Sequence, residues 1–236
     1  VLDDLHDRSD VRYLGVRHEQ AAALIADGYA RVSGKPGTCL VTSGPGATNL
    51  VTGIAQAHVA HSPVVAIAGG PTTHHYYRNA FQELDLVNLF RPITKSSLLV
   101  NLADRVPELL RHSYRVALSG RRGPAYLEIP RDLLNGQTID FEADGGPPFG
   151  SVGTPRSAGD PDAISAAARI LAAAKRPVLM AGGGVVLSES GSALLQLAEK
   201  LGAAVVTSYG HNDAVDNDHP AFLGPLGRMG SPEAAE

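Results

Sequence analysis

The chain has 236 residues, 44% of them hydrophobic, and a formal net charge of −4. This is the composition of a globular protein with an ordinary core. Acidic residues outnumber basic ones and no Lys/Arg run occurs, so the sequence does not indicate a nucleic-acid-binding surface. Every apolar run is shorter than the ~18–20 residues of a membrane span, so we expect no membrane partner.

The only cysteine, Cys39, cannot form an internal disulfide and lies in an apolar run. We expect it to be a small buried hydrophobe in a protein of a reducing compartment, the cytoplasm. The chain begins with Val1 in what reads as the middle of a helix. We therefore interpret it as a fragment, and whether a targeting segment precedes it stays an open question.

Apolar runs alternate with helical patterns along the first 130 residues. We expect strands at 13–16, 38–42, 63–68 and 125–129, and helices at 19–32, 47–60 and 102–116. Gly34 and Pro36 are stop signals for the first helix. Strands that are apolar on both faces are typical of a parallel sheet covered by helices. The sequence therefore predicts an α/β fold, with a three-layer domain that has helices on both faces of a parallel sheet.

Residues 143–159 are rich in Gly, Pro and Ser, as expected for a linker. They separate a first domain, 1–142, from part of a Rossmann-like central domain, 160–236. In the second region we expect Asp160 as an N-cap, with Pro161 at the first helical position. The expected elements that follow are a helix to about 175, a strand at 178–181, a helix ending at 201 and a strand at 203–206.

Two glycine-rich turns and the histidines were weighed as binding sites. The stretch SGPGATN, 43–49, lies between a strand and a helix, where free N–H groups can meet an anion. It lacks the lysine of a P-loop, so a tight connection is the alternative interpretation. The glycines at 182–184 are a weaker signal of the same kind. The nine histidines have neither an HExxH motif nor a cysteine partner, so no metal site is predicted in this chain.

Glu19 is a lone acid in the first turn of an alanine-rich helix. The helix dipole stabilises such an acid, which is one interpretation. The small residues that follow it, Ala21–Ala23, Ala26, Gly28 and Ala30, allow another element to approach closely, at an interface or in a core. Burial at such a boundary is expected to raise the pKa of Glu19 and to make it a usable proton donor.

Five segments in order resemble the thiamine-diphosphate-dependent enzymes related to acetolactate synthase. They are RHEQAAALIADGYARVSGKPG, LVTSGPGATNLVTGIAQA, PVVAIAGG, NAFQELDLVNLFRPITK and GPAYLEIPRDL. Together they cover residues 11–142 almost continuously, and residues 160–228 resemble the central domain of that family. The resemblance implies a pyrimidine-binding first domain, a thiamine diphosphate cofactor and a carboligase or decarboxylase that acts on pyruvate-like 2-oxoacids. It also implies a cytoplasmic homodimer or dimer of dimers, with the site at the interface, that serves branched-chain amino acid biosynthesis.

The resemblance assigns roles to individual residues. Glu19 corresponds to the catalytic glutamate that hydrogen-bonds a nitrogen of the cofactor's aminopyrimidine and favours its imino tautomer. The residues that line the site beside the pyrimidine are Gly44, Pro45, Gly46 and Asn49. Phe81 and Gln82 of the FQE motif approach the substrate side of the cofactor, and Gln82 is counted with the catalytic residues.

Three departures from the acetolactate synthase pattern concern substrate and flavin. Arg131 stands where these enzymes carry a lysine near the substrate, and arginine differs from lysine in geometry. Ala60 stands where these enzymes commonly carry an Asp, and the HSP triplet at 61–63 is similar to the sulfoacetaldehyde acetyltransferase branch. Arg121 matches an arginine that contacts FAD, yet the segment LGPLGRMG, 223–230, lacks the His-Gly pair that accompanies flavin. The resemblance therefore speaks against FAD.

In this family a third domain with a GDG…N motif holds Mg²⁺ and the diphosphate, and no segment of this chain matches that motif. We therefore expect the isolated fragment to be inactive. Within the family, the alternatives are sulfoacetaldehyde acetyltransferase, a 2-oxoacid decarboxylase and an acyl-CoA lyase. From another class, the alternative is a non-catalytic Rossmann-like binding or assembly module, against which the intact Glu19 and FQE motif argue.

Overall fold

The computed structural model describes residues 5–135 and 158–235. The chain divides into two compact units, Val1–Pro155 and Arg156–Glu236. This division falls inside the segment 143–159, most of which lies outside the described residues. The linker and the domain bounds at 142 and 160 therefore stay predictions, and each unit is described by itself.

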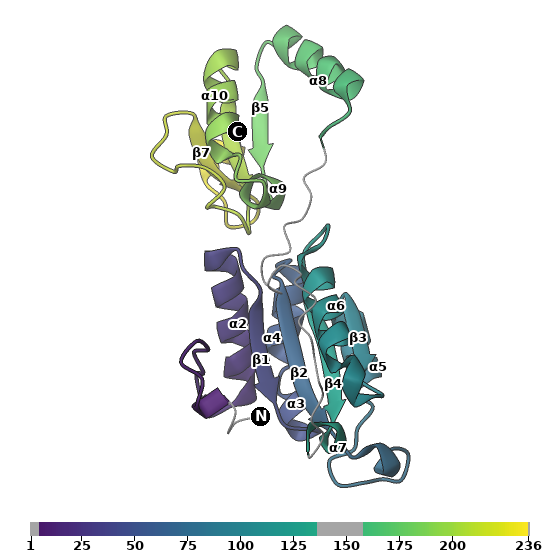
Figure 1. The fold of residues 1–236 in the computed structure, drawn as a ribbon. Helices are drawn as coiled ribbons and strands as arrows, with labels where there is room; N and C mark the ends of the chain where they lie inside the picture. The colour runs from purple at the N-terminus through teal and green to yellow at the C-terminus, as the bar shows by residue number, and fades with distance from the viewer. Residues whose placement is uncertain (1–4, 136–157, 236) are drawn as a thin grey trace. The chain divides into compact units, whose positions relative to one another are not determined.

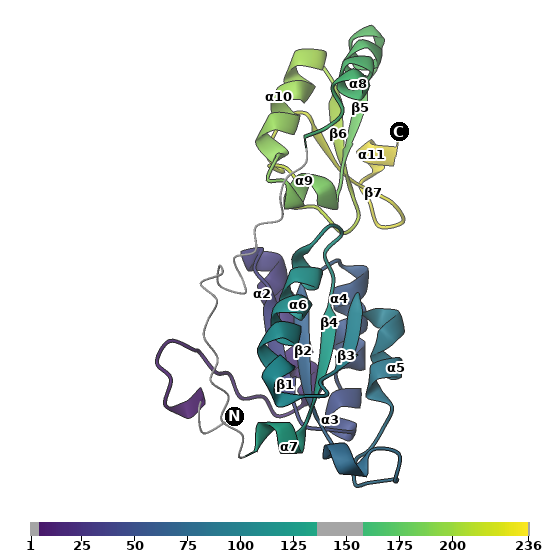
Figure 2. The same ribbon diagram turned by 45° about the vertical axis from the view of Figure 1, so that its right-hand side comes forward.

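The first unit contains one parallel sheet with the strand order β1-β2-β4-β3 (Figures 1 and 2). Its strands are β1 (Gly37–Val41), β2 (Val64–Gly70), β3 (Ser96–Leu99) and β4 (Ala125–Pro130). Its α-helices are α2 (Glu19–Ser33), α3 (Pro45–Thr48), α4 (Val51–Val59), α5 (Leu86–Phe90), α6 (Val106–Leu118) and α7 (Arg131–Leu134). Short 3₁₀ helices lie at η1 (Thr73–His75), η2 (Arg91–Ile93) and η3 (Ala103–Arg105).

The central strand β2 is buried on both faces, because helices cover both sides of the sheet. Val64, Ala66 and Ala68 belong to a core cluster with residues of α2, α4 and α5. Val65 belongs to another cluster, which includes Ala117 of α6. The predicted parallel, three-layer α/β fold is therefore confirmed.

The small residues of α2 pack inside the first unit. A Cβ atom added to Gly53 of α4 would lie 2.5 Å from the Cβ of Ala23, and one added to Gly37 would lie 2.1 Å from the carbonyl oxygen of Ala26. Only glycine allows these two backbones to come so close to α2. Ala23 and Ala26 therefore form part of the core, whereas Leu24 and Ile25 on the same helix are exposed.

Three expectations about elements of the first unit are corrected. Residues 13–16 form no strand; Tyr13 and Leu14 are more than half exposed, because no strand of the sheet pairs with this run. The expected helix at 47–60 is two helices, α3 and α4. Strand β3 was not expected, because it begins with two serines and so lacks an apolar signal.

The second unit has a parallel sheet with the strand order β5-β6-β7. Its strands are β5 (Val178–Ala181), β6 (Ala204–Ser208) and β7 (Phe222–Leu226), and its helices are α8 (Pro161–Ala173), α9 (Gly183–Leu187), α10 (Gly191–Leu201) and α11 (Pro232–Ala235). The Asp160 carboxylate accepts the N–H of Ala163 at 2.8 Å, so the predicted N-cap is confirmed. The expected helix before Leu201 is two helices. Strand β7 was not predicted, because Gly224 and Pro225 interrupt its apolar run.

No helix in the described parts of the chain combines the length and apolarity needed to cross a membrane. Cys39 is buried in the first unit and unpaired with another cysteine. Burial raises the pKa of its thiol to about 12, which leaves it protonated and unreactive at neutral pH. The expectation of a buried, structural cysteine is confirmed.

Candidate active site at the carboxyl edge of the first sheet

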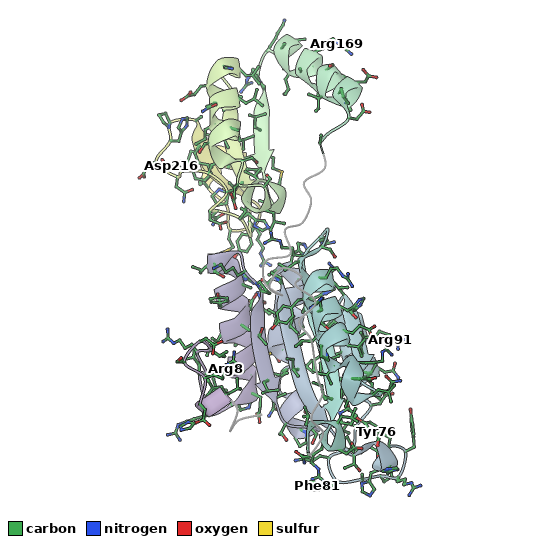
Figure 3. All side chains as sticks on the ribbon, in the orientation of Figure 1. Arg8, Tyr76, Phe81, Arg91, Arg169 and Asp216 are labelled. Atoms are coloured by element: carbon green, nitrogen blue, oxygen red, sulfur yellow. The ribbon has the colours of Figure 1, made fainter. Side chains whose placement is uncertain are left out.

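The predicted site residues gather where the strands of the first sheet end. Strands β1, β2 and β4 are parallel, so their carboxyl ends meet at one edge. Three segments leave from that edge: the turn 42–49 after β1, the segment 71–83 after β2, and helix α7 after β4. Helix α2 begins at the same edge, since its last turn precedes the start of β1. Tyr76 and Phe81 lie at this end of the unit (Figure 3).

Glu19 is the first residue of α2, directly after the N-cap His18, whose side chain accepts the N–H of Gln20. The amide of Asn49 donates to Glu19 Oε2 at 3.0 Å. This hydrogen bond favours the charged carboxylate and lowers its pKa below the ordinary value. The expectation of a raised pKa is wrong for the chain by itself, because Glu19 is only partly buried.

The glycines of the turn 42–49 allow two close approaches. A Cβ atom added to Gly46 would lie 2.6 Å from Thr42 Cγ2 and 3.4 Å from Glu19 Oε1. Gly44 has φ +55°, and a Cβ atom there would lie 2.7 Å from the carbonyl oxygen of Gln82. Gly46 therefore keeps space open beside the Glu19 carboxylate, and Gly44 lets the segment 71–83 contact the turn. Pro45, next to both, is the first residue of α3.

Gln82 is fixed against this turn, whereas Phe81 projects away from it. Ser43 Oγ donates to Gln82 Oε1 at 2.9 Å, and Gln82 has a left-handed backbone with φ 61°. Phe81 is 88% exposed. The structure thus brings Gln82, Gly44, Gly46, Asn49 and Glu19 together at one edge, with Phe81 at its rim.

The other two predicted residues, Arg131 and Arg121, lie at opposite edges of the sheet. Arg131 is the first residue of α7 and is exposed at the same sheet edge as Glu19. Arg121 precedes β4 and contacts His61, which precedes β2, at 2.6 Å. Arg121 and His61 therefore lie at the amino edge of the sheet, so the structure does not bring Arg121 to Glu19.

Sequence reasoning missed five residues that hold the segment 71–83 in place. Tyr76 donates to Glu128 of β4, and Thr73 donates to Asp132 of α7. The Glu83 carboxylate accepts backbone N–H groups of its own segment. Glu83, Glu128 and Asp132 belong to quoted motifs, FQEL and LEIPRDL, but their hydrogen-bonding partners could not be known before the strand order.

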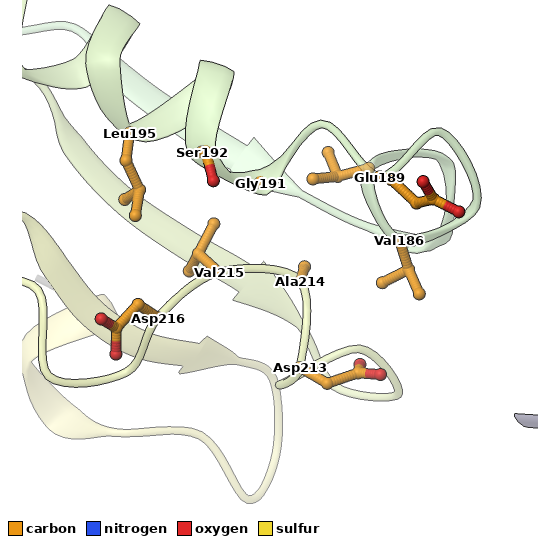
Figure 4. Close-up of a pocket in the computed structure, with 10 residues that line it drawn as sticks. Val186, Glu189, Gly191, Ser192, Leu195, Asp213, Ala214, Val215 and Asp216 are labelled. Carbon is orange, nitrogen blue, oxygen red and sulfur yellow. The ribbon is translucent and has the colours of Figure 1, made fainter. Parts of the chain in front are cut away.

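The second unit has an open hollow at the carboxyl ends of β5 and β6 (Figure 4). Its lining includes Glu189, Asp213 and Asp216 beside Val186 and Leu195. Among the residues that the structure describes, no group of three His, Cys, Asp or Glu is placed to hold a metal ion.

Family models of known proteins match two regions of the chain. Residues 1–89 match the family model of the thiamine pyrophosphate enzyme N-terminal TPP-binding domain, and residues 164–236 match that of the thiamine pyrophosphate enzyme central domain.

Curated relatives match nearly the whole chain. A protein named "Probable acetolactate synthase large subunit" from Methanococcus aeolicus is 42% identical over 236 residues, which are 98% of this chain and 39% of the relative. An acetolactate synthase from Arthrospira platensis is 37% identical over 98% of this chain and 40% of its own length. The acetolactate synthase large subunit from Haemophilus influenzae is 37% identical over 99% of this chain and 41% of its own length.

The chain therefore spans about two fifths of the length of these relatives. Its two matched regions are the N-terminal TPP-binding domain and the central domain, in the order and with the parallel sheets described above. The chain belongs to the thiamine-pyrophosphate-dependent enzyme family.

Proposed function

We propose that this chain supplies the cofactor-activating carboxylate of an acetolactate-synthase-like enzyme, a carboligase or decarboxylase of pyruvate-like 2-oxoacids. The observation that carries the proposal is the Glu19 carboxylate, held by Asn49 at 3.0 Å beside the space that Gly46 leaves. The names of the relatives support the substrate class.

The residues present fit the pyrimidine end of thiamine diphosphate. When bound, this cofactor supplies a ring that stabilises the negative charge formed on the substrate's carbonyl carbon. Glu19 would hydrogen-bond a ring nitrogen of the pyrimidine, where its carboxylate could hold or release a proton. Asn49 orients the carboxylate, Gly46 leaves room for a flat ring beside it, and Gln82 and Phe81 face the substrate. Arg131, at the same edge, attracts the substrate's carboxylate.

The low pKa of Glu19 in the single chain bears on this role. A carboxylate that shares a proton with a weakly basic ring works best when its pKa is raised toward neutrality. We propose that a second protomer supplies the missing burial in a homodimer or dimer of dimers. The exposed apolar side chains near the start of α2 support this assembly: Tyr13, Leu14, Leu24 and Ile25.

The remaining parts of the proposal concern groups outside the described residues. Mg²⁺ and the diphosphate are assigned to a further domain of the enzyme, because the family that the chain resembles holds them with a GDG…N motif and the chain spans about two fifths of its relatives' length. FAD is left out of the proposal, because the segment 223–230 lacks the His-Gly pair that accompanies flavin in the enzymes that the chain resembles. The lone cysteine, unpaired with another cysteine, supports a cytoplasmic protein, and the resemblance to acetolactate synthases supports a place in branched-chain amino acid biosynthesis.

The test compares three forms of the full-length protein: wild type, Glu19→Gln and Glu108→Gln. Acetolactate formation from pyruvate is measured with thiamine diphosphate and Mg²⁺, with and without added FAD. Glu19→Gln is expected to lower kcat by about 10²–10⁴-fold, the range that general acid–base groups contribute. Glu108 pairs with Arg105 on α6, and its variant is the matched control that keeps full activity.

Two results would contradict the proposal. Equal activity of Glu19→Gln and wild type would remove the assigned role of Glu19. Wild-type protein that makes no acetolactate with or without FAD would remove the substrate assignment. The same assay with sulfoacetaldehyde, other 2-oxoacids and acyl-CoA substrates then identifies which related branch is correct.

A further inference from the structure

Glu128 is a buried acid for which the roles above give no reason. It lies on β4, is 1% exposed and faces the layer that contains Tyr126. Burial raises its pKa, and the nearby Asp85 acts in the same direction, while the Tyr76 hydrogen bond opposes both. The Tyr126 hydroxyl is near enough to affect this pKa but makes no hydrogen bond of ordinary geometry among the described residues. A buried carboxylate is costly unless it is hydrogen-bonded.

The hydrogen-bond donor to Glu128 is Tyr76, from the segment 71–83. The Tyr76 hydroxyl donates to Glu128 Oε1 at 2.7 Å. Burial raises the pKa of Tyr76, and Glu128 raises it further, so the hydroxyl keeps the proton that it donates. A Cβ atom added to Gly70 would lie 2.3 Å from that hydroxyl and 2.8 Å from Glu128 Oε1. The hydrogen bond between Tyr76 and Glu128 therefore requires a glycine at position 70, the last residue of β2.

A second carboxylate from the same β4–α7 stretch holds the start of the segment. Asp132 accepts the backbone N–H of Thr73 at 2.9 Å and the Thr73 hydroxyl at 2.6 Å. Glu128 and Asp132 thus bind Tyr76 and Thr73, which lie at or next to the ends of the short helix η1.

The rest of the segment 71–83 is hydrogen-bonded to the Glu83 carboxylate, and Gln82 near its end contacts the turn 42–49. Tyr77, Asn79 and Gln82 have left-handed backbones, with φ of 65°, 53° and 61°, which is unfavourable for residues other than glycine. The Glu83 carboxylate accepts the N–H groups of Ala80 and Tyr77, and these and neighbouring N–H groups lower its pKa. This unfavourable backbone persists only if its ends are held.

We propose that Glu128 is a positioning residue: by accepting the Tyr76 hydroxyl, it holds the segment 71–83 so that Gln82 stays against Gly44 and Phe81 stays at the rim of the site. Its consequence for catalysis rests on the proposed function; its consequence for the order of the segment does not. Glu128 acts through Tyr76 and is assigned no contact with substrate or cofactor.

The test uses four variants of the full-length protein. Tyr76→Phe removes the donor, Glu128→Leu removes the acceptor, and Glu128→Gln keeps a carbonyl oxygen in the acceptor's place. Tyr114→Phe is the matched control, because the Tyr114 hydroxyl also makes a hydrogen bond, to Thr38 at 2.6 Å, away from the segment. Two rates are measured: amide hydrogen exchange of peptides within 71–83, and chymotryptic cleavage after the exposed Phe81.

Loss of one hydrogen bond is expected to speed both rates about fivefold in Tyr76→Phe and Glu128→Leu. Tyr114→Phe is expected to leave them unchanged, and Glu128→Gln to return them to within about twofold of wild type. In the pyruvate assay, Tyr76→Phe lowers kcat/KM while the Kd of thiamine diphosphate stays the same, because the segment faces substrate.

Unchanged rates in Tyr76→Phe would overturn the inference, as would failure of Glu128→Gln to restore them. If Glu128→Leu does not fold, Tyr76→Phe decides, since it removes a single oxygen from a partly exposed side chain. A wild type with no activity on pyruvate would contradict the proposed function but leave both rates interpretable. The two failures are therefore distinguishable.

Discussion

At the scale of single residues, the state of Glu19 depends on Asn49. The Asn49 amide favours the charged carboxylate, so the folded pKa of Glu19 lies below its unfolded value. A lowered pKa adds stability that is fully present above the unfolded pKa and is lost as the pH falls through the folded pKa. The chain by itself therefore keeps Glu19 ionised at neutral pH.

Asn49→Ala is expected to raise the pKa of Glu19, because the N–H group that stabilises the charge is removed. The measurement is an NMR titration of the Glu19 carboxyl carbon in the 236-residue chain. Asn88→Ala is the control, since Asn88 makes a similar amide-to-carboxylate bond, to Asp85 at 2.6 Å. A Glu19 pKa that Asn49→Ala leaves unchanged would show that this bond does not set the charge.

The sequence predicted some of these residues and not others, for a physical reason. Glu19 lies in the motif that starts helix α2, and Gly46 and Asn49 lie in the motif of the turn 42–49. The family resemblance of these two motifs predicts that the three residues share one site. Tyr76 and Glu128 are 52 positions apart and meet only because β2 pairs with β4. No local pattern encodes that strand order, and so the support of the segment 71–83 could not be predicted.

At the scale of elements, the contact between α2 and α4 depends on glycine. Gly53→Ala would place a methyl group 2.5 Å from Ala23 Cβ and is expected to lower the free energy of unfolding by about 1–3 kcal/mol. Gly28→Ala on α2 is the control, because a Cβ there meets nothing within 4 Å and a helical alanine adds about 0.5–1 kcal/mol. Urea unfolding measures both, and equal effects of the two variants would contradict the packing described.

The bounds of the helices and strands show which of them the pattern of apolar residues can predict. Helix α2 ends at its predicted stop signal, with Gly34 in the left-handed conformation at φ 68°. Strands β1, β2 and β4 carry the apolar character of buried strands. The run at 13–16 has the same apolar character but no neighbouring strand, whereas β3 has a neighbour and little apolar character. Strand formation there depends on pairing rather than on local sequence.

At the scale of the whole chain, the two units differ in how much they bury. The first unit has a continuous core around β2 and β4. In the second, no described residue of α8 is buried, and Val178 and Met180 of β5 are more than half exposed. Apolar burial provides most of the stability of a domain, so the first unit is expected to be the more stable one.

Hydrogen exchange of the 236-residue chain in increasing urea checks this expectation. Peptides from β5 and β6 are expected to lose protection at lower urea than peptides from β2 and β4. Loss of protection at one common urea concentration would show instead that the chain unfolds as a single cooperative unit.

The central claim, that Glu19 activates thiamine diphosphate, is tested most directly by the exchange of the cofactor's C2 proton. In the full-length protein, hydrogen–deuterium exchange at C2 of bound thiamine diphosphate is followed by quenched-flow NMR. Glu19→Gln is expected to slow this exchange by about 10²-fold or more, while Glu108→Gln leaves it at the wild-type rate. An exchange rate in Glu19→Gln equal to that of wild type, with cofactor bound, would contradict the claim.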